Sequence, residues 1–202
     1  MIELINENPS ITKNRISSAV FTFPRTEIFY FGNYQRKDIL HNIMFEVKKS
    51  EKVNTNKTYV RGEMSDFHHF IDNPYFNYFF DEIFASIQQV DNSYKKKENI
   101  IIEEAWGNIL KKGQSVHPHD HPCHQGILYL TDGNPLIFPQ VGFRFTPKAG
   151  DYLIAPPRLI HYVEEVKEDV ERINIVFNYT IYDNFKSVNN LYSKDSGQPG
   201  SK

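Results

Sequence analysis

The chain of 202 residues contains only one cysteine, Cys123. A single cysteine cannot form an internal disulfide and excludes a zinc site built from several thiolates. The sequence also lacks long apolar runs, since no N-terminal segment resembles a signal peptide and no stretch is long enough to span a bilayer. We therefore expect a cytoplasmic protein without a membrane partner.

An excess of charge of one sign is also missing. The chain has 23 Lys and Arg against 25 Asp and Glu, a net charge of -2 at neutral pH. Proteins that bind nucleic acid or anionic membranes usually carry a basic surface, so the composition indicates neither partner. The length suits one well-buried domain rather than two.

Histidine, in contrast, is concentrated in one stretch, residues 113–129. Four of the eight histidines of the chain fall there: His117, His119, His121 and His124. Successive side chains of a strand alternate between its faces, so His119 and His121 can point the same way and share one ion. The best candidate for a third imidazole is His161, which follows a predicted strand and turn. This ligand type suits iron, zinc, copper or nickel, and the alternative is a surface loop that binds metal adventitiously.

The first half of the chain has a mixed pattern. Residues 17–23 and 27–31 are rich in aromatic and β-branched residues and predict short strands. Residues 36–50 predict a helix, because apolar residues recur at helical spacing. A second helix is predicted after Asp72 or Asn73 as N-cap, with Pro74 in its first turn and an aromatic face directed towards the core.

From residue 99 onward, short β-like runs follow one another, separated by Gly, Pro, Asn and Asp. This pattern predicts a mainly β fold, a sandwich or barrel with flanking helices. We divide this single domain into N-terminal strands and helices (1–98), a β core (99–182) and a tail (183–202) that is disordered from Ser193. The predicted strands of the core are residues 100–110, 126–131, 135–138, 142–146, 151–155, 159–163 and 172–182.

The histidine-rich stretch resembles the first of the two cupin motifs. Gly113 is followed after five residues by His119 and His121, with Gln125 four positions further on. Cupins usually have glutamate at the position of Gln125. The resemblance implies that both histidines bind a metal.

A second stretch resembles the other cupin motif, in the expected order along the chain. Gly150 is followed after five residues by Pro156 and then by His161. Arg158 stands where a glycine is usual. The two motifs together imply a double-stranded β-helix, the jelly-roll barrel, with the metal inside its mouth.

A longer series, covering roughly residues 100 to 180, resembles the iron(II)- and 2-oxoglutarate-dependent oxygenases, in particular the small bacterial and phage prolyl-hydroxylase-like group. This resemblance implies an Fe(II) enzyme that uses 2-oxoglutarate and O2, hydroxylates a protein or small-molecule substrate that the sequence does not identify, and releases succinate and CO2. The matching residues are Trp106, Asn108, Gly113, His119, His121, Pro122, Gly126, Tyr129, Gly150, Pro156, His161, Arg172, Asn174 and Asn178.

Arg172 distinguishes an oxygenase from other cupin-like proteins. If Val166 and Lys167 form the tip of a charged hairpin, Arg172 lies opposite His161, on the same face as Asn174. The resemblance implies that this arginine binds the distal carboxylate of 2-oxoglutarate, which its planar fork suits. The alternative is a surface salt bridge to a nearby glutamate.

The ligand set departs from the family pattern, in which the second residue is Asp or Glu rather than His121. Asp120 lies between the two histidines and is expected to face away from the metal unless the backbone bulges. We therefore prefer three histidines: His119, His121 and His161. The alternatives are His117 in place of one of them, or two histidines with water.

Weaker candidates are Asn108 and Tyr129, which can hydrogen-bond the cosubstrate or simply be satisfied in the core. Two rival functions stay open. One is a cupin-type metalloenzyme that does not use 2-oxoglutarate, such as a three-histidine dioxygenase or an isomerase, in which Arg172 should meet a protein carboxylate. The other is a non-catalytic cupin-like binding module. A homodimer is possible on the sequence alone.

Overall fold

The computed structural model describes residues 2–4, 10–13, 18–22, 28–91, 94 and 99–182. The tail from residue 183, with its predicted disorder from Ser193, lies outside the described residues. Within these ranges, each helix is too short or too polar to cross a bilayer.

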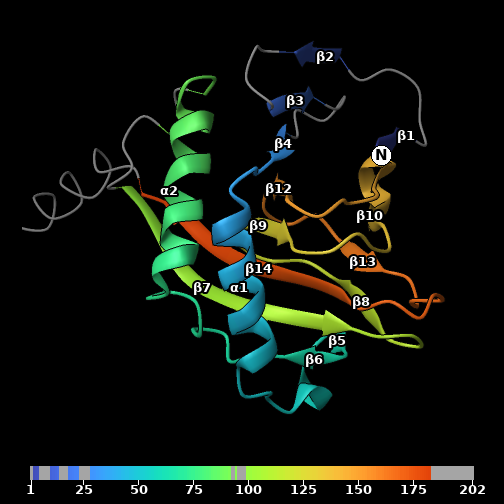
Figure 1. The fold of residues 1–202 in the computed structure, drawn as a ribbon. Helices are drawn as coiled ribbons and strands as arrows, with labels where there is room; N and C mark the ends of the chain where they lie inside the picture. The colour runs from blue at the N-terminus through green and yellow to red at the C-terminus, as the bar shows by residue number, and fades with distance from the viewer. Residues whose placement is uncertain are drawn as a thin grey trace, which may run out of the picture.

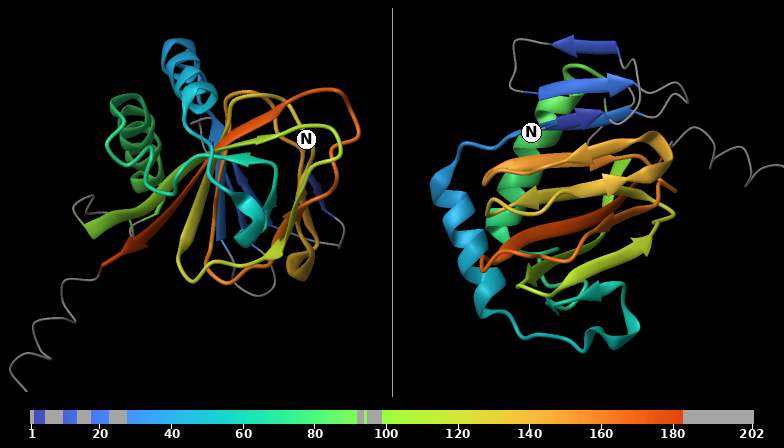
Figure 2. Two further views of the ribbon diagram at one scale, coloured as in Figure 1. Left: turned by 90° about the horizontal axis from the view of Figure 1, so that it is seen from below. Right: turned by 90° about the vertical axis from the view of Figure 1, so that its right-hand side faces the viewer.

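The described strands form two antiparallel sheets (Figure 1). The smaller sheet has the order β1 (Ile2–Leu4), β11 (Phe143–Phe145), β10 (Leu136–Phe138), β13 (His161–Val163), β8 (Ser115–His119) and β5 (Val60–Arg61). The larger has the order β2 (Ser10–Lys13), β3 (Ser18–Thr22), β4 (Ile28–Asn33), β12 (Asp151–Ala155), β9 (His124–Tyr129), β14 (Arg172–Ile181), β7 (Ile100–Leu110) and β6 (Glu63–Met64). The left view of Figure 2 shows strands wrapped around a common interior, with both helices outside it. The predicted jelly-roll fold, mainly β with flanking helices, is confirmed.

Both predicted helices form. α1 (Lys37–Lys49) buries Ile39, Ile43 and Val47, which lie four residues apart on one face of the helix. α2 (Pro74–Gln88) begins after Asn73, whose side chain accepts hydrogen bonds from two backbone N–H groups of the first turn at 3.0 Å. Of the two N-cap candidates, Asn73 is therefore the one used. A 3-10 turn, η1 (Thr55–Lys57), follows α1, and another, η4 (Pro139–Val141), follows β10.

The helices cover the outer face of the larger sheet, where Phe177 of β14 is the central contact. Its ring lies 5.4 Å from that of Phe76 and 5.7 Å from that of Phe80, both edge-to-face. Gly126, on the neighbouring strand β9, has no room for a side chain, because a Cβ there would lie 1.9 Å from the Phe177 ring. The aromatic face of α2 is thus core, as the helical spacing predicts.

We expect Phe177→Ala to lower the free energy of unfolding by about 3–5 kcal/mol, because the substitution removes a buried ring and leaves a cavity between helix and sheet. Urea unfolding measures the difference. The control is Tyr78→Ala on α2. The Tyr78 side chain is 61% exposed, and its loss should change stability by no more than about 0.5 kcal/mol. Equal stability of the two variants would contradict this packing.

Backbone conformation explains three positions of the cupin-like motifs. Gly113 and Gly150 have φ values of 81° and 87°, in the left-handed region that glycine adopts without strain. Arg158, which replaces the usual glycine, is also left-handed, with φ 65°. Its backbone N–H donates to the carbonyl of His121 at 2.8 Å, so this turn holds the loop that carries a candidate ligand.

The predicted hairpin between His161 and Arg172 is wrong. β13 pairs with β10 and β8, whereas β14 pairs with β7 and β9, so the intervening chain crosses from one sheet to the other. Val166, the expected exposed tip, is fully buried between the sheets and its backbone bonds Gly113 and Gln114. An apolar side chain in a charged segment gains more from the core than from a solvent-exposed turn.

Candidate metal centre

His119, His121 and His161 come together where β8 meets β13. His119 ends β8, His161 begins β13, and the pairing of the two strands places these residues opposite each other. His121 lies two residues beyond the end of β8, so it is the following turn, not the strand alternation we expected, that brings it close. Each histidine has one ring nitrogen that lies within 4.8 Å of a ring nitrogen of each of the other two.

Backbone carbonyls orient two of the rings. Nδ1 of His119 lies 2.8 Å from the carbonyl oxygen of His117, and Nδ1 of His161 lies 3.0 Å from that of Leu159. We infer that each Nδ1 carries the proton and donates it, which leaves the Nε2 lone pair for an ion. Nε2 of His121 is buried and has no hydrogen-bond partner.

All three imidazoles are neutral at physiological pH. Burial lowers the pKa of His119, and burial together with the neighbouring imidazoles lowers the pKa of His121 to about 4 and that of His161 to about 3. Metal ligation requires the unprotonated ring. Three neutral imidazoles with nitrogen atoms free of partners therefore fit a transition metal such as iron, zinc, copper or nickel.

The alternative ligands lie elsewhere. His117 is exposed and does not belong to the group of three. Asp120 directs its carboxylate to Arg158, at 3.6 Å. His124 stacks on Tyr179, with ring centroids 5.2 Å apart. Among the described residues, no Asp or Glu joins the three histidines.

Arg172 is buried inside the molecule, with only 1% of its surface exposed. Its Nε donates to the carbonyl oxygen of Asn134 at 3.2 Å, and its guanidinium lies over the ring of Tyr129, 5.2 Å from the centroid. The alternative surface salt bridge is not formed, since Glu164 pairs with Arg144 and Glu171 pairs with Lys48. Within the described part of the chain, Arg172 has no carboxylate partner.

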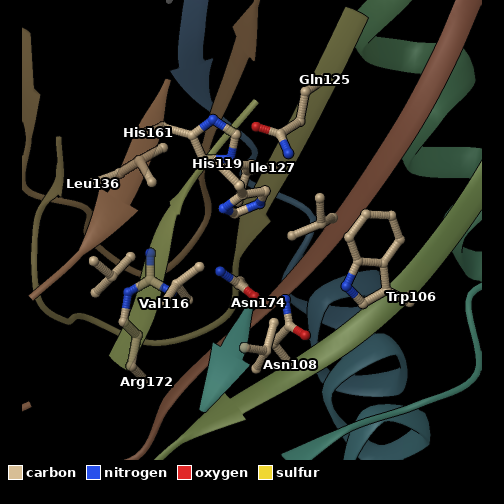
Figure 3. Close-up of a pocket in the computed structure, with 13 residues that line it drawn as sticks. Trp106, Asn108, Val116, His119, Gln125, Ile127, Leu136, His161, Arg172 and Asn174 are labelled. Carbon is tan, nitrogen blue, oxygen red and sulfur yellow. The ribbon is translucent and has the colours of Figure 1, made fainter. Parts of the chain in front are cut away.

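Arg172 and two of the histidines line one pocket between the sheets, which we call the inner pocket. In Figure 3, the guanidinium and the amides of Asn108 and Asn174 lie on one side, and His119 and His161 on the other. About 40 Å³ of this pocket is open to the centres of water-sized atoms, so the space is small. Several buried polar atoms around it lack partners: Trp106 Nε1, Asn108 Oδ1, Gln125 Oε1, Tyr129 OH and Asn174 Oδ1.

A second, open depression of about 510 Å³, the outer cleft, lies on another side of the histidines. His119 and Trp106 line both the inner pocket and the outer cleft, and His121 lines the cleft alone. The three histidines thus lie between the small inner pocket and the larger outer cleft.

Solved structures with a similar fold include two prolyl hydroxylases and a protein that binds nickel and 2-oxoglutarate. HygX from Streptomyces hygroscopicus with nickel and 2-oxoglutarate bound has a TM-score of 0.59 and 12% identity over 76% of this chain and 82% of HygX. A Pseudomonas putida prolyl-4-hydroxylase has a TM-score of 0.54 and 14% identity over 77% and 93% of the two chains. A viral collagen prolyl hydroxylase from Paramecium bursaria Chlorella virus-1, in its 2OG complex, has a TM-score of 0.52 and 17% identity over 76% and 96%. At these identities, the similarity establishes the fold. No protein-family model and no curated protein matches the sequence.

Sequence analysis missed some residues at this centre. Tyr59 stacks on His119 with ring planes 6° apart, and nothing in the local pattern around it indicates a site. Glu104 and Asn178 lie beside His121, because the Asn178 amide donates to Glu104 at 2.6 Å and lies 3.3 Å from His121 Nδ1. Trp106 is among the residues of the family resemblance, but no local pattern indicates that it lines both the inner pocket and the outer cleft.

Proposed function

We propose that the protein is an iron(II)- and 2-oxoglutarate-dependent oxygenase that hydroxylates a protein or small-molecule substrate. The observation that supports this most strongly is the buried guanidinium of Arg172. It faces the same narrow pocket as His119 and His161 and has no carboxylate partner within the described chain.

A buried charge is costly unless an opposite charge compensates it. Arginine stays protonated at neutral pH even though burial lowers its pKa. Its described contacts, the carbonyl of Asn134 and the side chain of Tyr129, carry no full negative charge, so we infer that a bound anion compensates the guanidinium. A dicarboxylic acid is such an anion, and it would bind the guanidinium with one end and the metal with the other.

In this proposal, His119, His121 and His161 would hold the iron through their imidazole nitrogens. Iron with 2-oxoglutarate supplies an oxidant derived from O2, with succinate and CO2 as products. Arg172 orients the cosubstrate, and Asn108, Asn174 and Tyr129 supply the surrounding hydrogen-bonding groups. The apolar walls of the inner pocket exclude water from this end of the site.

A cupin-type metalloenzyme without 2-oxoglutarate is less well supported. That alternative predicts that Arg172 meets a carboxylate of the protein, and the described chain provides none. Two of the similar structures contain bound 2-oxoglutarate, which agrees with the proposal. A ligand set without a carboxylate has one negative charge fewer than the usual one, so we expect the redox properties of the iron to differ.

The test is anaerobic addition of iron(II), then 2-oxoglutarate, to the full chain. We expect a visible metal-to-ligand charge-transfer band that needs both components, and slow formation of succinate once O2 is admitted. Zinc in place of iron should abolish both signals, because it has no accessible redox change. Absence of the band at saturating iron and 2-oxoglutarate would contradict the proposed function.

A further inference from the structure

The outer cleft has an unbalanced charge. Its wall contains the carboxylates of Asp66, Glu104 and Asp120, and no Lys or Arg is among the described residues that line it. Two of these carboxylates have cationic or potentially cationic neighbours, because Asp120 lies 3.6 Å from Arg158 and Asp66 lies 3.6 Å from the His68 ring. Glu104 has neither. The neutral amide of Asn178 donates to it at 2.6 Å.

The rest of the cleft is mostly apolar and aromatic. Phe67 packs edge-to-face on Trp106, with centroids 5.2 Å apart, and Tyr59 lies flat on the His119 ring at 4.6 Å. Aromatic faces attract organic cations as well as apolar chains. The cleft therefore has apolar and aromatic walls, which suit an apolar chain. It also has one carboxylate without a cationic neighbour, Glu104, beside the metal centre.

An independent observation indicates that a ligand approaches here. Trp106 is only 4% exposed, and its indole Nε1–H has no hydrogen-bond partner at the boundary between cleft and inner pocket. A buried donor of this kind costs free energy unless something accepts from it. A carbonyl or hydroxyl oxygen of a molecule bound next to the histidines can provide that acceptor, whereas a protonated amine cannot, so we expect the ligand to carry such an oxygen as well.

We propose that the primary substrate is an organic cation, an amine or guanidinium on an apolar chain, bound in the outer cleft with its positive group at Glu104. This inference rests on the proposed function for the reaction: one C–H bond becomes C–OH, one oxygen atom of O2 enters the product, and 2-oxoglutarate is oxidised to succinate and CO2. Glu104 takes no part in that chemistry. It positions the substrate and selects it by charge.

The chain has a single tryptophan, Trp106, so its fluorescence reports on the cleft directly and without metal or turnover. We would titrate the metal-free protein with pentylamine and 1-pentanol, which share one chain and differ in charge. We expect pentylamine to bind about 10- to 100-fold more tightly than the alcohol, the usual gain from a charged hydrogen bond, and its binding to weaken with added salt. Equal binding of amine and alcohol would overturn the proposal.

Glu104→Gln tests the residue itself, because glutamine keeps the acceptor for Asn178 and removes only the charge. We expect the preference for pentylamine over pentanol to disappear. The matched control is Glu103→Gln, the adjacent residue of β7, which is exposed and bonds Thr180 instead. An undiminished preference in Glu104→Gln, or an equal loss in Glu103→Gln, would refute the assignment.

A capped Gly-Lys-Gly peptide, compared with its norleucine counterpart, identifies the source of the cation. Tighter binding of the lysine peptide than of pentylamine would assign a polypeptide side chain, and the reverse would assign a free amine. Both outcomes support a cationic substrate. The fluorescence result stands even if no charge-transfer band forms with iron and 2-oxoglutarate, so failure of the proposed function is distinguishable from failure of this inference.

Discussion

Replacing Arg172 by alanine is expected to weaken 2-oxoglutarate binding at least about 30-fold. The guanidinium is buried, and removing one partner of a buried, hydrogen-bonded charge pair costs about 2–5 kcal/mol. The concentration of 2-oxoglutarate that gives half the charge-transfer band measures the effect. Because iron is held by the histidines, its affinity should stay unchanged in this variant.

Two further variants make the Arg172 result specific. Arg172→Lys keeps the charge but loses the planar fork, so we expect an intermediate loss. Arg144→Ala, which removes an arginine paired with Glu164 near the surface, should leave 2-oxoglutarate binding as in the unaltered protein. If the band forms at the same 2-oxoglutarate concentration in Arg172→Ala, the cosubstrate assignment is wrong and the buried charge has another purpose.

The second large effect is expected for His161→Ala, which should lower iron affinity at least about 100-fold. Loss of groups that only support a ligand already costs about 10- to 100-fold, so loss of a ligand should cost no less. Equilibrium dialysis followed by measurement of bound iron gives the affinity. Thermal unfolding of the metal-free variant shows whether its fold is retained.

His68→Ala is the matched control for this experiment, since His68 is an exposed histidine outside the group of three. It should bind iron like the unaltered protein. The same measurement on His117→Ala and His121→Ala decides between the ligand sets that the sequence left open. A full complement of iron in His161→Ala would exclude the three-histidine centre.

Much of the architecture could be predicted from local patterns. The spacing of Ile39, Ile43 and Val47 predicts α1, and Asn73 followed by proline predicts the start of α2. Short β runs separated by turn residues predict the core strands. These features depend on residues close together in the chain, where periodicity and capping give direct signals.

The errors concern contacts between distant segments. The hairpin after His161 was wrong because the charged sequence around Val166 conceals one buried side chain, and strand pairing cannot be read from charge alone. The two-residue strands β5 and β6 are too short to show any alternation. Tyr59 and Glu104 reach the centre only through pairings of β5 with β8 and of β7 with β14, which no local pattern specifies.

β14 places Arg172 and Asn174 in the inner pocket, whereas Ile173 and Phe177 pack towards the helices. A shift of one residue in the register of β14 would exchange the two sets of side chains. The guanidinium would then lie in the apolar core and an aromatic ring in the pocket. Partners on both edges, β7 along its length and β9 over six residues, resist that slip. A register error in this strand would therefore remove the active site and the core packing at the same time. A molecule with this error would be unfolded rather than folded and inactive.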